Sequence, residues 1–312
     1  MNTGVRTLAL FAAIVALFVV VGGLLGAWIF GSFLGGLLVA LVFSAAFNLV
    51  SYLLCDRFVL WSSRARIVPP AEAPRLARLV DDLAPQFGLV APRIAIVPSE
   101  TPNAFATGRN ERHAVVAATV GILRLLDDRE LRGVLAHELA HVKDRDVLLM
   151  TLAATIAGAI SYASEMVIFG AIFGGGNNRN GGGLAALLAA ITAPIAAMLL
   201  QLAISRSRES RADEVGARTI GDPLALADAL GKLEAGNARR PMPFGSPASS
   251  SLYIVNPFRG STLAGWFSTH PPIEQRIARL RAMAADPHYR VAVRSPTLRS
   301  TAPLGLGSAR KE

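Results

Sequence analysis

The sequence predicts an α+β membrane protein that has four transmembrane helices and a mainly helical cytoplasmic part with a small β-sheet. Hydrophobic residues make up 52% of the 312 residues and charged residues only 17%, and the mean hydropathy is +0.44. This composition is too apolar for an ordinary soluble domain. The apolar residues also gather into two long pairs of segments, and the sequence between the pairs has the periodicities of amphipathic helices and short strands.

The first apolar stretch, residues 7–55, contains no Asp, Glu, Lys or Arg. As one helix it would be roughly twice as long as the ~30 Å hydrocarbon core of a bilayer. It therefore predicts two spans, residues 8–30 and 33–54, that turn at Gly31 and Ser32. A cleaved signal peptide is the alternative for the first span, but the run is too long and a second span follows at once.

A second apolar pair covers residues 147–173 and 184–204, and a Gly/Asn-rich linker at residues 174–183 predicts a flexible turn between them. Glu165 interrupts the third span. An intramembrane carboxylate suggests a functional group, but near the end of a span it can simply reach the interface, which is the interpretation we favour. Pro194 in the fourth span predicts a kink.

The distribution of arginines predicts the orientation in the membrane. The short connections carry only Arg179, whereas the other side carries Arg57, Arg64, Arg66, Arg206, Arg208 and Arg211. By the positive-inside rule the N-terminus and the C-terminus are both expected to be cytoplasmic. The net charge of +9 has no nucleic-acid recognition motif beside it, so the lipid bilayer, and not nucleic acid, is the expected partner. The single Cys55 excludes an internal disulfide.

The segment between the two pairs of spans predicts a small sheet beside helices. Residues 75–87 have one apolar face, typical of a helix, and residues 92–97 and 113–118 alternate as strands do. The outer strand of such a sheet can pair with an extended peptide through backbone hydrogen bonds. Asn103 and Phe105, between the two strands, are candidates for binding a peptide, and turn chemistry and core packing are the equally weighted alternative.

The most informative motif is His137-Glu-Leu-Ala-His141, on a predicted helix over residues 127–146 that continues with little interruption into the third span. At i and i+4 the two histidines lie on one helix face, where both can bind one metal ion. Glu138 can then take a proton from a metal-bound water, as in zinc proteases.

A catalytic zinc ion needs a third protein ligand. The class that supplies a later histidine is excluded, because Asp144 and Val147 stand where its glycine and histidine would be. Glu209 follows the fourth span, which returns to the membrane face where the third span begins, so Glu209 is the expected ligand. Asp213, four residues later, can orient a ligand imidazole. A solvated charged helix is the alternative for this segment.

The sequence resembles the HtpX-type membrane zinc metalloproteases, which are gluzincin-like and related to the CAAX prenyl proteases. The resemblance covers residues 7–280 and rests on Pro102-Asn-Ala-Phe-Ala-Thr-Gly108, His137-Glu-Leu-Ala-His141, Ser207-Arg-Glu-Ser-Arg-Ala-Asp213 and Thr269-His-Pro-Pro272. It implies one Zn²⁺ per chain held by His137, His141 and Glu209, and Glu138 as catalytic base. It also implies a bacterial inner-membrane endopeptidase in membrane-protein quality control and stress response, and a substrate-binding role for Asn103.

The C-terminal part predicts helices over residues 223–234 and 274–283. Residues 236–266, rich in Pro, Ser and Gly, suggest a lid or loop over the cleft. His270 can stabilise an oxyanion or merely anchor the following helix, and Arg276 is a weaker candidate for the same catalytic role. Residues 290–312 are expected to be disordered.

Five segments follow from these patterns: hairpin 1 (1–56), a cytoplasmic part with the histidine motif (57–146), hairpin 2 (147–205), a cytoplasmic part with the third ligand (206–289) and the tail (290–312). The predicted substrates are polypeptides, chiefly membrane or misfolded proteins. The alternatives are a processing protease for lipidated or other specific peptides and, more remotely, a non-enzymatic scaffold stabilised by metal. Glu138 argues against the scaffold, because a purely structural metal site needs no base.

Overall fold

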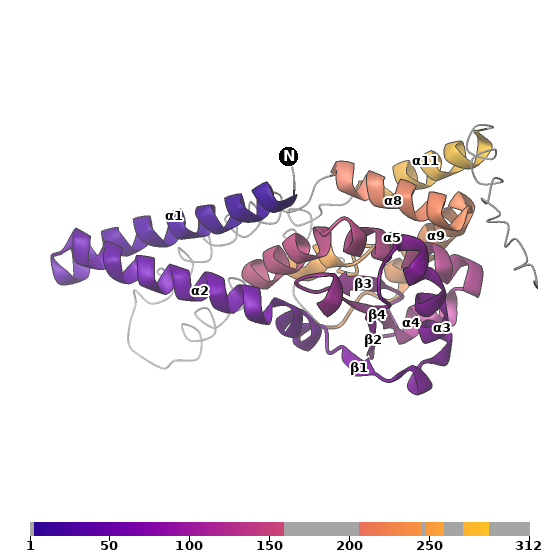
Figure 1. The fold of residues 1–312 in the computed structure, drawn as a ribbon, viewed down its shortest axis with the longest axis horizontal. Helices are drawn as coiled ribbons and strands as arrows, with labels where there is room; N and C mark the ends of the chain where they lie inside the picture. Colours follow the sequence, from indigo (N-terminus) through magenta and orange to yellow (C-terminus); the bar gives the residue numbers. More distant parts are fainter. Residues whose placement is uncertain (1–2, 159–205, 245–246, 259–270, 287–312) are drawn as a thin grey trace, which may run out of the picture.

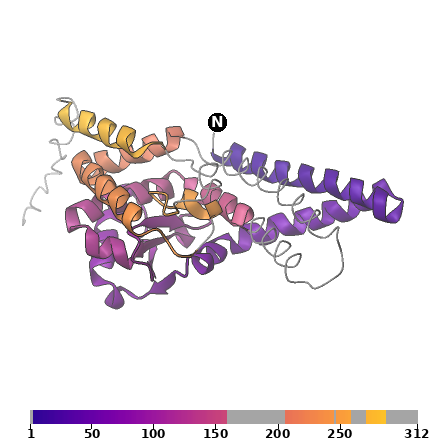
Figure 2. The same ribbon diagram turned by 180° about the vertical axis from the view of Figure 1, so that it is seen from behind.

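The computed structural model describes residues 3–158, 206–244, 247–258 and 271–286. A helical hairpin, α1 and α2, projects from a larger body in which helices surround a small sheet (Figure 1), and the view from behind shows the same two parts (Figure 2). The sheet contains both parallel and antiparallel pairs. The predicted mainly helical α+β architecture with a small sheet is therefore confirmed for the described residues.

The hairpin consists of α1 (Thr3–Phe30) and α2 (Phe33–Ser62), and it turns where the sequence predicts. Gly31 has a positive φ of 65°, a conformation that glycine adopts at little cost. Ser32 caps α2, and its hydroxyl accepts a hydrogen bond from the Gly35 amide at 3.0 Å. These two residues reverse the chain between the helices.

Glycines allow α1 and α2 to pack closely. A methyl group added at Gly22 or at Gly26 would overlap atoms of α2, at Ala40 and Gly36 respectively. Close approach through small residues spaced four apart is typical of helix pairs in membranes.

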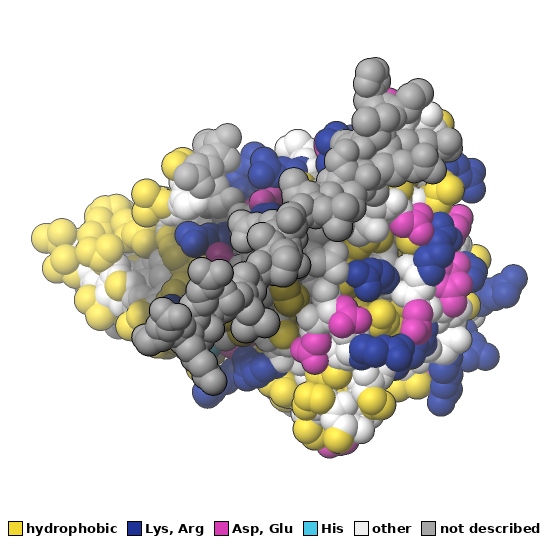
Figure 3. All heavy atoms as spheres, turned by 45° about the vertical axis from the view of Figure 1, so that its right-hand side comes forward, with side chains coloured by type: hydrophobic (Ala, Val, Ile, Leu, Met, Phe, Trp, Pro, Cys, Tyr) yellow, Lys and Arg dark blue, Asp and Glu magenta, His cyan; other side chains and the backbone are white. Residues whose placement is uncertain are grey.

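Among the described residues, α2 is the one helix both long enough and apolar enough to cross a membrane. Its 30 residues correspond to a length of about 45 Å. Only 11% of its most apolar window is buried, and Figure 3 shows the exposed hydrophobic side chains of the projecting hairpin apart from the charged surface of the body. An apolar surface of this extent is typical of a membrane-embedded element.

The start of the predicted third span is a helix over Asp146–Gly158. Its apolar side chains pack with Leu10, Ile14 and Cys55 of the hairpin. The rest of the second pair of spans, with its linker, Glu165 and Pro194, lies outside the described residues.

The sheet has four strands in the order β1-β2-β4-β3: β1 (Arg66–Val68), β2 (Arg93–Val97), β3 (Ala104–Thr107) and β4 (Val115–Thr119). The central strands β2 and β4 are parallel, and the edge strands β1 and β3 are antiparallel to their neighbours. The two predicted strands are β2 and β4. The edge strands were not predicted, because β1 is only three residues long and β3 is Ala-rich and buried at every position, without alternation.

Helices cover both faces of this sheet. Ile94, Ala106 and Val116 face a core shared with α3 (Pro74–Leu83), α5 (Asp128–Lys143) and α9 (Pro223–Arg239). Phe105 and Val115 face the other way, toward the end of α2, the Asp146–Gly158 helix and the segment before residue 254. Short helices complete this part: η1 (Pro70–Glu72), η2 (Ala84–Phe87), η3 (Glu111–His113) and α4 (Val120–Leu125).

The helix α5 begins with a capping box and ends earlier than predicted. Asp127 accepts a hydrogen bond from the Glu130 amide at 2.8 Å, and the Glu130 carboxylate accepts one from the Asp127 amide at 3.2 Å. At the other end the chain leaves the helix at Asp144, and Arg145 has a positive φ of 58°. The expectation that α5 continues with little interruption into the third span is therefore corrected: the next helix is separate and begins at Asp146.

The remaining elements are α8 (Arg206–Ile220), α9, η4 (Pro247–Leu252) and α11 (Ile273–Ala285). The two predicted C-terminal helices correspond to α9, which runs five residues further than residue 234, and α11. Helices α8 and α9 both pack against α5, and α11 packs against α9.

Candidate metal centre

Three buried side chains from α5 and α8 converge on one point. The Nε2 atoms of His137 and His141 are 3.2 Å apart, and they lie 3.7 and 3.4 Å from the two carboxylate oxygens of Glu209. Ligands at about 2.0–2.1 Å from a tetrahedral metal ion are about 3.3 Å from one another. The side chains are 1–3% exposed and form the one group of potential metal ligands of this kind in the described part of the chain. Their spacing and their N, N, O donor set fit a divalent ion.

A close helix contact brings Glu209 to the two histidines. A Cβ atom on Gly216 of α8 would lie 3.0 Å from the backbone of Ala136 and His137 in α5. A larger residue at this position would require the two backbones to move apart by a few tenths of an ångström. Glu209 and Asp213 lie seven and three residues before Gly216, on the same face of α8, so both carboxylates reach the α5 histidines.

A carboxylate fixes the orientation of His137. The Nδ1 atom of His137 is 2.9 Å from Asp213 Oδ1, so this nitrogen donates its proton and Nε2 presents a lone pair toward the metal centre. Arg276, fully buried, donates to both oxygens of Asp213 at 2.7 and 3.0 Å and to the Ile254 carbonyl at 3.0 Å. Burial alone would raise the pKa of Asp213, but the charge of Arg276 and the contact with His137 lower it to about 2.

A second carboxylate, which the sequence analysis did not single out, lies beside His141. The Oδ2 atom of Asp146 is 3.8 Å from His141 Nδ1, and its Oδ1 forms an ion pair with Arg208 Nη1 at 2.9 Å. The same residue types, histidine, carboxylate and arginine, meet at His137, but there the histidine–carboxylate distance is shorter, 2.9 Å. The signal in the sequence was an aspartate five residues after His141. The expected continuous helix would have placed this aspartate on a different helix face from His141.

Glu138 is held against the edge strand of the sheet. Its Oε2 accepts a hydrogen bond from the Ala106 amide of β3 at 2.8 Å, and the side chain is 3% exposed. Burial raises the pKa of Glu138, and the neighbouring histidines oppose that rise. A buried carboxylate with a raised pKa is suited to accepting a proton near neutral pH. Sequence alone gave no indication of the Ala106 contact.

The side chain of Asn103 forms hydrogen bonds that join the segment around Val255 to strand β3. Its Nδ2 donates to the Val255 carbonyl at 2.6 Å, and its Oδ1 accepts from the Ala104 amide at 3.1 Å. The Ile254 amide also donates to the Ala104 carbonyl at 3.2 Å. The outer edge of β3 is therefore occupied near residue 104 by residues 254–255, and near residue 106 by Glu138.

The other predicted site residues have different surroundings. Phe105 is 1% exposed and packs edge-on against Tyr253, with ring centroids 5.1 Å apart, which fits the core-packing alternative rather than substrate contact. Arg276 contacts Asp213 and a carbonyl, and its Nη2 lies 3.5 Å from His137 Nδ1, so its position corresponds to orienting the Asp213 carboxylate and the His137 ring. His270 lies outside the described residues.

Comparison with known proteins agrees with this geometry. The Peptidase family M48 model matches residues 70–284. A protease HtpX homolog of Thermococcus kodakarensis is 53% identical over 82% of this chain and 90% of its own length. Homologs with the same name from Syntrophobacter fumaroxidans and Pyrococcus furiosus are 48% and 49% identical over 91% and 90% of this chain, and over 100% and 96% of their own.

The crystal structure of S. mikatae Ste24p aligns with a TM-score of 0.46 at 18% identity, over 88% of this chain and 64% of that longer chain. The sequence relatives cover nearly the whole chain at far higher identity. The chain thus belongs to peptidase family M48, among the HtpX proteases, and is a membrane-associated metalloprotease.

Proposed function

We propose that this chain is a zinc-dependent endopeptidase in which His137, His141 and Glu209 hold one zinc ion. The observation that carries the proposal is the mutual spacing of 3.2–3.7 Å among three buried donor groups. Nitrogen and carboxylate ligands at tetrahedral spacing favour Zn²⁺ over harder ions such as Mg²⁺. When bound, such an ion polarises the scissile carbonyl and lowers the pKa of water.

Glu138 is the proposed general base. Its carboxylate takes a proton from the attacking water and later delivers it to the leaving amine. The Ala106 amide, which donates to Glu138 Oε2, holds the carboxylate in place for both transfers. Asp213 and Asp146 act as positioning residues that keep the Nδ1 side of each histidine turned away from the metal.

The proposed substrates are membrane or misfolded polypeptides, cleaved at the cytoplasmic face of a bacterial inner membrane in protein quality control. In the proposed topology, which has four spans and both termini and the metal centre in the cytoplasm, the site would lie at the membrane surface. Three observations support this placement: the exposed apolar hairpin, the helix that leaves the metal centre at Asp146 to pack on it, and the arginines near both.

The proposal is tested by separating metal binding from cleavage. Glu138→Gln is expected to retain zinc but to lose at least about 100-fold in casein cleavage, because general acid–base catalysis contributes about 10²–10⁴-fold. Glu209→Gln is expected to lose zinc as well, measured by metal analysis after dialysis. Glu214→Gln, an exposed glutamate on α8, is the matched control. Full activity of Glu138→Gln would refute the mechanism, and wild-type zinc content in Glu209→Gln would refute the ligand set.

A further inference from the structure

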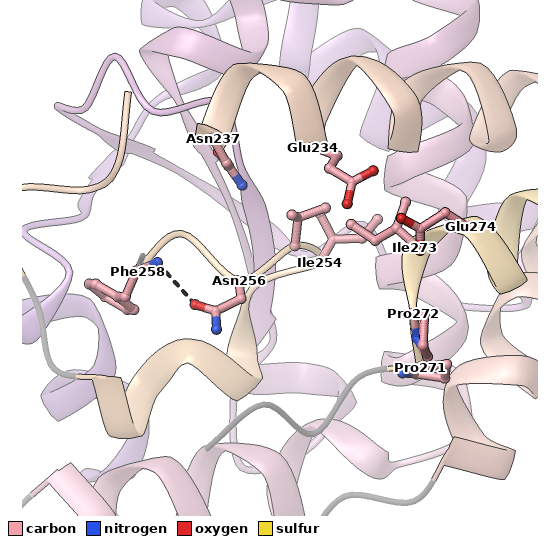
Figure 4. A pocket seen from close by; sticks show the side chains of 10 residues that line it. Glu234, Asn237, Ile254, Asn256, Phe258, Pro271, Pro272, Ile273 and Glu274 are labelled. Carbon is pink, nitrogen blue, oxygen red and sulfur yellow. Dashed lines mark hydrogen bonds between the residues drawn. The ribbon is translucent and has the colours of Figure 1, made fainter. Parts of the chain in front are cut away.

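A pocket of about 280 Å³ lies between α9, α11 and the segment that covers the edge of β3. In Figure 4, Glu234 and Asn237 extend from α9 toward Ile254 and Asn256, and Glu274 lies on the neighbouring start of α11. The volume is close to the lower limit for small-ligand sites. It suits one or two amino-acid side chains.

One buried amide of this pocket, that of Asn237, has no hydrogen-bond partner in the part of the chain that the structure describes. Asn237 is 1% exposed, yet neither its amide nitrogen nor its amide oxygen has a hydrogen-bond partner among the described residues. Leaving a buried amide unpaired costs about 1–3 kcal/mol. Such a group in a pocket therefore points to a ligand that supplies the missing hydrogen bonds.

The pocket is also acidic in a chain of net charge +9. Glu234 and Glu274 both line it, and neither carboxylate forms an ion pair with another residue in the part of the chain that the structure describes. The remainder of the lining is mostly apolar, with Ile254, Phe258 and Pro271 among it. Apolar walls with two carboxylates at the rim match a side chain that has a long aliphatic stem and a cationic head.

We propose that this pocket binds the side chain of an arginine or lysine in the polypeptide substrate, with Glu234 and Glu274 contacting the cation and Asn237 contacting a peptide group. A divalent cation fits less well, because the described residues that line the pocket offer two carboxylates and no third anionic ligand. The pocket would thus contribute to the choice of cleavage site. This inference rests on the proposed peptidase function.

The pocket wall connects to the metal centre through Arg276 and Asp213. The Ile254 carbonyl accepts a hydrogen bond from Arg276, and Arg276 also donates to Asp213. The Ile254 amide donates to the Ala104 carbonyl of β3. The same strand positions Glu138 through Ala106. A peptide that occupies the pocket therefore lies against the segment that braces both the metal-ligand histidine and the catalytic base.

The test uses the full chain in detergent micelles and a set of quenched fluorescent peptides. A peptide that the wild type cleaves is varied one position at a time, with arginine or glutamine at each position. We expect one position at which arginine raises kcat/KM about fivefold over glutamine, the effect of a partly exposed ion pair. In the double variant Glu234→Gln, Glu274→Gln the preference should vanish, so that the arginine and glutamine peptides are cleaved with equal kcat/KM. Asp82→Asn, an exposed carboxylate on α3, is the control and should keep the preference.

Equal kcat/KM values for arginine and glutamine at every position, or an undiminished preference in the double variant, would overturn the inference and leave the peptidase function intact. Failure of the wild type to cleave any peptide would instead count against the peptidase function. In that case fluorescence anisotropy still tests the pocket. The Glu138→Gln variant should bind a labelled arginine peptide about fivefold more tightly than the matching glutamine peptide, and equal affinities would refute the proposed pocket specificity.

Asn237 provides a second, independent readout. Asn237→Leu removes the unpaired amide at similar volume, so Tm should rise, whereas the affinities for the arginine and glutamine peptides should fall by the same factor. A lower Tm would show that Asn237 has a structural partner, which would contradict its proposed role in binding peptide.

Discussion

Gly216→Ala is expected to weaken zinc binding although the residue contacts no metal ligand side chain. The new Cβ would lie 3.0 Å from the Ala136 carbonyl carbon and from the His137 amide nitrogen, whereas favourable carbon contacts lie at about 3.5–4.0 Å. The backbones of α5 and α8 must then move apart by a few tenths of an ångström. Metal–ligand distances tolerate only about 0.2 Å, and Glu209 moves with α8. A loss of about 10–100-fold in zinc affinity is expected, comparable to the loss of a residue that orients a ligand.

Competition with a chromophoric zinc chelator, on the full chain in detergent micelles, measures this change. The matched control is Gly231→Ala on α9, where a Cβ would meet only the Ile277 side chain at 3.9 Å, an ordinary contact. Both substitutions replace glycine inside a helix, which by itself stabilises the fold by up to about 1 kcal/mol. Gly231→Ala should keep wild-type zinc affinity and an equal or higher Tm. The reasoning about helix spacing is wrong if Gly216→Ala also binds zinc with wild-type affinity.

Two further substitutions test how the centre is braced. Arg276→Met leaves Asp213 as a buried charge without its main counterion, so the protein should lose about 3–5 kcal/mol of stability and its Tm should fall sharply. Arg129→Met breaks two ion pairs of a side chain that is 46% exposed, and each exposed pair should contribute less than about 1 kcal/mol. Similar Tm values for the two variants would contradict the importance of the buried pair. Asn103→Ala removes the hydrogen bond to the Val255 carbonyl, so hydrogen exchange in residues 250–258 should accelerate, and unchanged exchange would show that the segment is held by other contacts.

The metal-binding part of the site was predictable because helical periodicity is local. The i, i+4 spacing of His137 and His141 depends only on α5 being a helix, and its capping residues and apolar face are visible in the sequence. Glu209 required a topological step, the return of the chain to the same membrane face. The structure shows the contact that completes this step, the packing of Gly216 against α5, which no local pattern predicts.

The features that were missed depend on contacts between distant residues. Strand β3 has no alternation of apolar and polar residues, because both of its faces are buried. Its sequence therefore does not have the pattern that predicts a strand. The pairing of Arg276 with Asp213 joins residues 63 positions apart. The break at Arg145, where a non-glycine residue has a positive φ, has no marker in the sequence, and this hid the proximity of Asp146 to His141.

In the proposed orientation, the length of α2 sets the height of the edge strand β3 above the bilayer. Of its about 45 Å, some 15 Å extends beyond a hydrocarbon core of about 30 Å, and in the proposed orientation this part lies on the cytoplasmic side. Val59 and Leu60 near its end pack on the sheet face that includes Phe105 of β3, so a continuous helix links the edge strand to the membrane. An extended chain rises about 3.3 Å per residue and covers this height in about five residues. A membrane-anchored substrate would therefore be cut no closer than about five residues from the point where it leaves the lipid, and shorter protruding tails would escape cleavage.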